Sequence, residues 1–232
     1  MTSPDAIFAH PRLAPVYDTF DGDRGDLAAY LAIAEESGAR LVLDVGCGTG
    51  SLAVLLASRG YAVVGVDPAA ASLAVARAKS SDVTWVHGDV SVVGALEADL
   101  ATMTGNVAQV FLTDEDWAAT LRGIHGALRP GGRFVFETRR PAYRAWEEWG
   151  GVEVRAGVEQ RLVVTDVRLP FVSFRYTYRF PSGEVLTSDS TLRFRDHDEL
   201  VTSLTAAGFR VLDVRQAPDR PGREYVFVTQ RD

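Results

Sequence analysis

One stretch decides the fold of this chain: Leu41-Val42-Leu43-Asp44-Val45-Gly46-Cys47-Gly48-Thr49-Gly50. Residues 41–45 favour a buried strand with Asp44 at its carboxyl end, and residues 51–58 are expected to form a helix. The glycines between them allow a tight turn. A strand, a glycine turn and a helix N-terminus bring backbone N–H groups to one point, where a ligand can approach closely. The turn contains no lysine, which favours a nucleoside site over a triphosphate site.

The composition is that of a globular protein with one large domain, or one domain with a substantial insertion. The 232 residues are 47% hydrophobic and 24% charged, and the formal net charge of −7 disfavours nucleic acid or an anionic membrane as the main partner. The single cysteine, Cys47, excludes an intramolecular disulfide and fits a reducing compartment. We recognise no signal peptide and no apolar run of about 20 residues. We therefore expect a cytoplasmic protein.

Strands and helices alternate along the first 140 residues, which predicts βαβ units and a parallel sheet. Residues 1–23 are expected to be irregular. Asp26 is expected to cap a helix that runs to about Glu36, and Thr113 to cap another. The residues after the glycine turn are expected to form strands at 61–66, 83–87, 98–103 and 133–137, helices at 69–79 and 113–128, and a turn at 129–132.

The pattern changes after the fifth strand. Residues 141–150 favour a short aromatic helix. From about Val152 to Arg195, hydrophobic and polar residues alternate with a period of two, which is typical of an antiparallel meander. A capping box formed by Asp196 and Glu199 then begins a helix. This helix is followed by two last strands, expected at 209–215 and 224–229.

These elements predict a domain that is interrupted once. The main domain takes residues 1–140 and 196–232, with an N-terminal cap and helix in residues 1–38. Residues 141–195 form an inserted subdomain, which either covers the substrate or makes a dimer contact.

Three acidic residues follow successive predicted strands, at the sheet edge where parallel sheets bind ligands. Asp44 precedes the glycine turn, where a dinucleotide site needs no acid but a methionine-type ammonium group does. Asp67 can accept both hydroxyls of a ribose, or cap the helix that follows it. Asp89 can accept the amine of adenine, or serve as a turn residue. The spacing Gly-x-Gly-x-Gly also differs from the Gly-x-Gly-x-x-Gly pattern of dinucleotide sites.

The run from Asp44 to Gly50 resembles motif I of the class I S-adenosylmethionine-dependent methyltransferases, and the likeness extends from about residue 41 to residue 137. The resemblance implies an α/β, Rossmann-like, doubly wound, seven-stranded and mostly parallel sheet, with the antiparallel meander inserted after strand 5. It also implies S-adenosylmethionine as cofactor, S-adenosylhomocysteine as product, and no metal. The residues that it implies to bind the cofactor are Asp44, Gly46, Cys47, Gly48, Gly50, Asp67, Pro68, Asp89, Val90, Met103 and Thr104.

The expected reaction is methyl transfer to an N or O acceptor on a small molecule. Displacement from a sulfonium depends mainly on alignment, although a hydroxyl acceptor usually needs a general base. Glu137 is a candidate base at the end of the fifth strand, or an ion-pair partner of a neighbouring arginine. Tyr17 is a candidate lid residue or an aromatic anchor. Asn106, Arg139 and Trp146 are candidate substrate residues.

The inserted sheet resembles, more weakly, that of small-molecule N-methyltransferases, and it is a candidate homodimer contact. Two alternatives remain open at this point. One is a catalytically silent protein of the same fold that binds S-adenosylmethionine or its product as a sensor. The other is a nicotinamide-dependent oxidoreductase.

Overall fold

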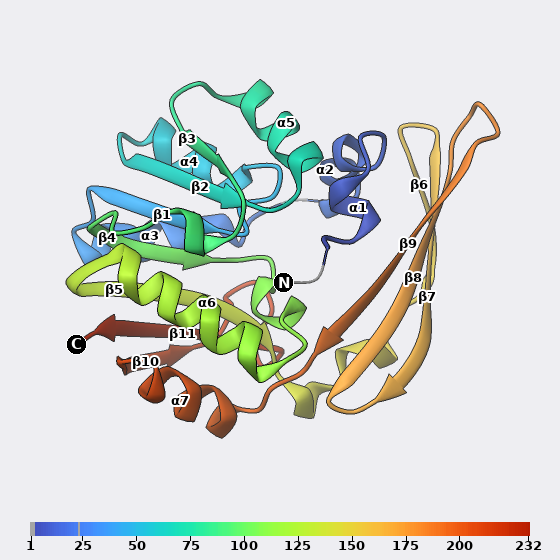
Figure 1. Ribbon diagram of the computed structural model, residues 1–232. Helices are drawn as coiled ribbons and strands as arrows, with labels where there is room; N and C mark the ends of the chain where they lie inside the picture. Colours follow the sequence, from blue (N-terminus) through green and yellow to red (C-terminus); the bar gives the residue numbers. More distant parts are fainter. Residues whose placement is uncertain (1–2, 23) are drawn as a thin grey trace.

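The computed structural model describes residues 3–22 and 24–232, and its centre is a seven-stranded sheet (Figure 1). The strands lie in the order β10-β11-β5-β4-β1-β2-β3, and β11 alone runs antiparallel to the other six. This arrangement confirms the predicted mostly parallel sheet. The strands are β1 Leu41–Val45, β2 Ala62–Asp67, β3 Thr84–His87, β4 Ala98–Met103, β5 Leu128–Arg139, β10 Phe209–Arg215 and β11 Glu224–Arg231.

Helices cover both faces of this sheet, because its strands are apolar on both sides. On one face Val42 and Val135 pack with residues of α3 (Leu27–Ser37) and α4 (Ser51–Ser58). On the other face Phe136 contacts Trp117 of α6 (Asp114–Ala127), with ring centroids 5.7 Å apart, and α7 (His197–Ala206) completes that layer. The remaining long helix, α5 (Ala70–Lys79), packs against α4 and β3. No described helix is long and apolar enough to cross a membrane.

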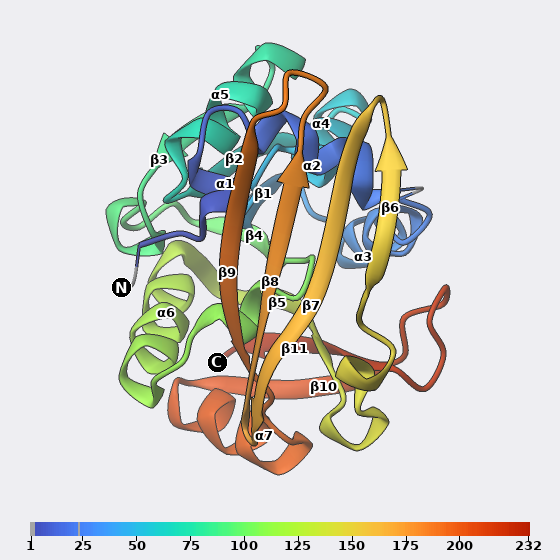
Figure 2. The same ribbon diagram turned by 90° about the vertical axis from the view of Figure 1, so that its right-hand side faces the viewer.

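A second, four-stranded antiparallel sheet stands across the carboxyl edge of the parallel strands (Figures 1 and 2). It consists of β6 Gly151–Arg155, β7 Val158–Arg168, β8 Phe171–Arg179 and β9 Val185–Arg193. Its inner face carries large apolar side chains such as Phe174 and Tyr178, which are buried. The predicted meander therefore exists as a sheet, and it faces the edge at which the three acids were expected.

The N-terminal segment differs from the expectation that residues 1–23 are irregular. It contains α1 (Ala6–Ala9) and α2 (Ala14–Asp21), which lie between the two sheets in Figure 1. The backbone N–H of Ile7 donates to Ser188 Oγ of β9 at 2.9 Å, and Ser72 Oγ of α5 donates to the Phe8 carbonyl at 2.9 Å. These short helices are therefore held by contacts on both sides rather than by local sequence preference.

The local predictions have mixed outcomes. Thr113 and Asp196 cap α6 and α7 as expected, each accepting a backbone N–H three residues ahead. Asp26 makes no side-chain cap for α3, because its carboxylate binds the Arg24 guanidinium instead. The expected turn at 129–132 is the irregular start of β5, and the expected helix at 141–150 is two 3₁₀ turns, η3 (Pro141–Tyr143) and η4 (Ala145–Glu147).

Candidate functional site

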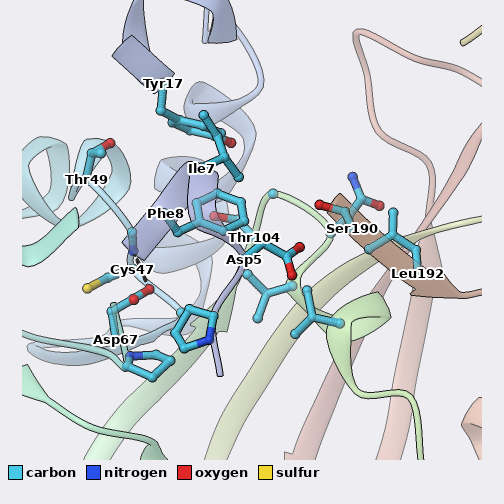
Figure 3. A pocket seen from close by; sticks show the side chains of 18 of the residues that line it. Asp5, Ile7, Phe8, Tyr17, Cys47, Thr49, Asp67, Thr104, Ser190 and Leu192 are labelled. Carbon is cyan, nitrogen blue, oxygen red and sulfur yellow. Dashed lines mark hydrogen bonds between the residues drawn. The ribbon is translucent and has the colours of Figure 1, made fainter. Parts of the chain in front are cut away.

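A cavity of about 610 Å³ lies between the carboxyl edge of the main sheet, the N-terminal segment and the inner face of the second sheet (Figure 3). All three parts of the chain contribute to its wall. In Figure 3 Asp67, Cys47 and Thr49 lie on one side, Phe8 and Asp5 in the middle, and Ser190 and Leu192 of β9 on the other. The cavity therefore has a main-sheet end and a second-sheet end.

The glycine turn needs all three of its glycines, for two different reasons. Each has a positive φ: 70° at Gly46, 54° at Gly48 and 85° at Gly50. An added Cβ would lie 2.7 Å from the Val107 side chain at Gly46 and 2.5 Å from the Trp85 ring at Gly50. At Gly48 it would meet nothing within 4 Å, and this residue lines the cavity. Gly46 and Gly50 thus allow neighbouring side chains to pack against the turn, while Gly48 presents its backbone to open space.

Asp44 lies at the main-sheet end of the cavity and is only 2% exposed. Thr102 Oγ1 of the neighbouring strand β4 donates to its Oδ1 at 2.8 Å. Burial, only partly offset by this hydrogen bond, raises the pKa of Asp44 to about 7. The site thus contains a buried carboxyl group that a cation would stabilise in its ionised form.

Asp67 closes the glycine turn from the adjacent strand β2. Its Oδ2 accepts the Gly48 N–H at 2.8 Å, and its Oδ1 accepts the Ala69 N–H at 2.7 Å. Burial raises the pKa of Asp67, and these two hydrogen bonds oppose that shift. Asp67 thus bonds to the residue that precedes α5 without capping the helix itself, and its carboxylate lies at the cavity wall.

The third acid, Asp89, also lines the cavity, together with Pro68, Val90 and Thr104. Its Oδ1 accepts the Ser91 N–H at 2.8 Å and also the Ser91 hydroxyl, so it caps the 3₁₀ turn η1 (Val90–Val92). The fold therefore brings Asp44, Asp67 and Asp89 to one cavity, at the ends of β1, β2 and β3.

Four predicted residues do not line the cavity, and three of them, Met103, Gly50 and Trp146, have packing roles. Met103 is fully buried in the core, Gly50 packs under Trp85, and Trp146 packs edge-to-face on Phe194 with ring centroids 4.8 Å apart. Trp146 therefore supports the second sheet rather than forming the expected substrate wall, and Met103 supports the main sheet.

Glu137 lies beneath the site rather than in it. It is fully buried and not among the cavity residues. Tyr30 of α3 donates to its Oε2, and the Gly105 N–H donates to its Oε1 at 2.7 Å. Both oxygens of Glu137 thus have donors already, which argues against the role of general base. Its contacts instead hold the loop at the end of β4.

Tyr17, Asn106 and Arg139 from the predicted set also line the cavity. Sequence reasoning did not assign several further residues that line it. They are Asp5, Ile7 and Phe8 from the N-terminal segment and Gln160, Phe174, Tyr176, Tyr178, Ser190 and Leu192 from the second sheet. The alternation of Phe174, Tyr176 and Tyr178 was a usable signal, because residues two apart on a strand share a face.

The comparison with known families agrees with this geometry. Residues 42–132 match the family model of a methyltransferase domain. This part of the chain therefore resembles a methyltransferase domain. S-adenosylmethionine is the methyl donor of this family. The matched residues include the glycine turn and all three acids of the site.

Individual relatives extend the likeness of the methyltransferase domain. A cypemycin N-terminal methyltransferase from a Streptomyces species is 33% identical over 144 residues, 60% of this chain and 59% of that protein. The chain thus spans less than two thirds of this relative's length. A solved S-adenosylmethionine-dependent methyltransferase from Clostridium acetobutylicum has a TM-score of 0.81 at 16% identity, covering 95% of this chain and 98% of its own. The sugar N-methyltransferase KedS8 from a Streptoalloteichus species has a TM-score of 0.75 at 20% identity, covering 94% of this chain and 91% of its own. These two structures establish likeness of fold.

Proposed function

We propose that this protein transfers a methyl group from S-adenosylmethionine to an N or O acceptor on a small molecule. The observation that carries the proposal is the cavity itself. It joins the glycine turn and three strand-end acids at one end to an aromatic wall from the second sheet at the other. A nucleoside-type cofactor and a separate acceptor can therefore meet inside one enclosed space.

The residues present fit S-adenosylmethionine. Gly48 offers an open approach to the backbone, and Asp44 is a buried carboxyl group suited to an ammonium group. Asp67 would hold the ribose hydroxyls, while Asp89, Val90 and Pro68 would surround the adenine. When bound, the cofactor supplies a methyl group on a sulfonium, which is already activated for displacement. Asp44, Gly46, Cys47, Gly48, Asp67 and Thr104 all contribute to the wall in which it would lie.

The chain's own contribution is alignment and the exclusion of water. The N-terminal segment closes the cavity over Phe8 and Tyr17, whose ring centroids lie 5.4 Å apart. The loop after β4 is fixed from below, because the Gly105 N–H bonds to Glu137 and the Asn106 amide bonds to Glu224 at 3.1 Å. A fixed loop at this point orients the acceptor, and orientation can supply much of the rate of a direct displacement.

An amine is the acceptor that suits these residues best. The described cavity wall contains no histidine, and Glu137 is not part of it. An amine needs only to lose a proton, whereas a hydroxyl usually needs a base to activate it. The names of the cypemycin and KedS8 enzymes, which describe N-methylation by those proteins, also support this choice.

Turnover tests the proposal. The protein is incubated with S-adenosylmethionine carrying a labelled methyl group and with matched amines and hydroxylated metabolites. We expect labelled product from at least one amine. Tight binding of the cofactor without any methylated product would instead favour the sensor, the alternative in which the domain binds S-adenosylmethionine without using it.

A further inference from the structure

Arg139 is the last residue of β5, and it lines the cavity. Its Nη1 donates to Gln109 Oε1 at 3.0 Å, and its guanidinium carbon lies 5.3 Å from the centroid of a Trp149 ring. A neutral amide and an aromatic face thus fix the orientation of the guanidinium. Neither partner neutralises its charge.

Arg139 differs in this respect from Arg24, the other arginine of the cavity wall. Arg24 donates to Asp21 at 2.7 Å and to both oxygens of Asp26 at 2.9 Å. Within residues 3–22 and 24–232, Arg139 forms no ion pair with a carboxylate. Burying a cation without a partner is costly, so burial lowers the pKa of Arg139.

The acids nearest to Arg139 act on its charge through space, but neither forms an ion pair with it, and Glu224 Oε2 is buried without a hydrogen-bond partner. Glu224 faces Arg139 across the β5–β11 pair, but its Oε1 accepts from Arg220 at 3.1 Å and from Asn106 Nδ2 at 3.1 Å. Glu137 is occupied by Tyr30 and Gly105. Among the described residues, no carboxylate therefore bonds directly to Arg139, and its guanidinium can bind an anionic group that enters the cavity.

Two tyrosines complete the surroundings of this guanidinium. Tyr17 of α2 and Tyr176 of β8 both line the cavity and interact electrostatically with Arg139. Burial raises the pKa of each phenol, so both stay protonated and can donate hydrogen bonds. The charged group that also faces these tyrosines, Asp21, is already paired with Arg24.

We infer that the methyl acceptor carries an anionic oxygen group, a carboxylate or a phosphate, which binds to Arg139 in the cavity. This inference rests on the proposed function, because it names the class of acceptor. Arg139 ends β5, which is directly beside β4 and its loop Thr104–Asn106, and neighbouring strands lie about 4.8 Å apart. The anionic group and the accepting atom therefore belong to one compact molecule. The apolar body of that molecule would contact Phe174 and Tyr178.

Small probes of different charge test this site directly. The protein is saturated with S-adenosylhomocysteine and titrated calorimetrically with benzoate, phenyl phosphate, neutral benzamide and cationic benzylammonium. We expect the anions to bind saturably and the other two probes at least tenfold more weakly. Tighter binding of benzoate than of phenyl phosphate assigns a carboxylate, and the reverse order assigns a phosphate.

Variants of Arg139 test whether this residue binds the anionic probes. Arg139→Gln should weaken the anionic probes at least tenfold, and Arg139→Lys, which keeps the charge, should recover part of the loss. The matched control is Arg168→Gln, an exposed arginine of β7 in the second sheet that pairs with Asp166 outside the cavity wall, and it should leave binding unchanged.

Equal anion affinity in Arg139→Gln and the native protein would overturn the inference, as would a preference for benzylammonium. If Arg139→Gln does not fold, the relative affinities of the four probes for the native protein and for Arg139→Lys still test the inference. The same titrations, repeated without S-adenosylhomocysteine, separate the anion site at Arg139 from the proposed methyl transfer. Anion binding without any affinity for S-adenosylhomocysteine would refute the proposed function and leave the anion site standing.

Discussion

At the scale of single residues, Asp67 at the end of β2 accepts the N–H of Gly48 in the glycine turn and the N–H of Ala69 before α5. If it also holds the ribose, Asp67→Ala should weaken S-adenosylhomocysteine binding by about 1–3 kcal/mol, measured by calorimetry. Asp99→Ala is the matched control, because Asp99 also accepts two backbone N–H groups, from Arg40 and Leu41, but is not in the cavity wall. Equal losses of affinity in the two variants would remove the ribose assignment.

Asp44 should make the stability of the ligand-free protein depend on pH. Its pKa is raised from 3.8 in the unfolded chain to about 7 in the fold, so the folded state favours the protonated acid. Its contribution to the free energy of unfolding is fully present below about pH 4 and is lost as pH rises through about 7. The loss amounts to about 4 kcal/mol at most.

Denaturant unfolding across this pH range measures the effect. Asn is neutral at every pH and can still accept from Thr102, so Asp44→Asn should flatten the part of the stability curve between about pH 4 and pH 7. A curve as steep as that of the native protein would contradict the assignment.

The sequence identified the three acids because each follows a strand directly, and strand ends can be read from local pattern. The structure places Glu137 and Met103 outside the cavity wall for a different reason. Both lie at or near strand ends, but the direction of each side chain depends on what packs against that face. Glu137 meets Tyr30 of α3, and Met103 meets the apolar core. These partners come from other parts of the chain, so no local pattern reveals them.

At the scale of elements, the N-terminal segment is held over the cavity by contacts with both α5 and β9. Ser188→Ala removes the acceptor of the buried Ile7 N–H, which should cost about 1–3 kcal/mol of local stability. Amide hydrogen exchange in α1 and α2 should then become faster, with little change in the main sheet.

Ser173→Ala is the control for this prediction. Ser173 lies in the same sheet and shares a hydrogen bond with Thr191, but it makes no hydrogen bond to the N-terminal segment. Exchange in α1 and α2 that is equally fast in both variants, or unchanged in Ser188→Ala, would contradict the closing role of this contact. Short helices of this kind escape sequence prediction, since tertiary contacts rather than local preference form them.

At the scale of the whole molecule, the sequence changes from alternating strands and helices to a region with a period of two. This change was sufficient to predict a parallel sheet and an antiparallel sheet. How the second sheet lies over the first could not be predicted, because that depends on contacts such as those of Trp146, Val172 and Phe194. The sequence also does not indicate which strands lie at the edges of the second sheet. β6 lies at one edge, and its five residues are all exposed.

This edge suggests how two copies of the chain would associate. Val152 and Val154 of β6 are 52% and 63% exposed, and an unpaired edge strand can add a strand from a second molecule. We predict a homodimer through β6, measured by light scattering after size exclusion. Val154→Lys should yield monomers, while Val185→Lys on β9 should not. A native protein that stays monomeric at high concentration would contradict this prediction.

The central claim is that the cavity binds S-adenosylmethionine for methyl transfer. Calorimetric titration of the purified protein with S-adenosylmethionine, S-adenosylhomocysteine and NADH in parallel tests it most directly. We predict saturable one-site binding of the first two, weakened by Asp67→Ala, and no binding of NADH. Binding of NADH without binding of S-adenosylmethionine would contradict the account and favour an oxidoreductase.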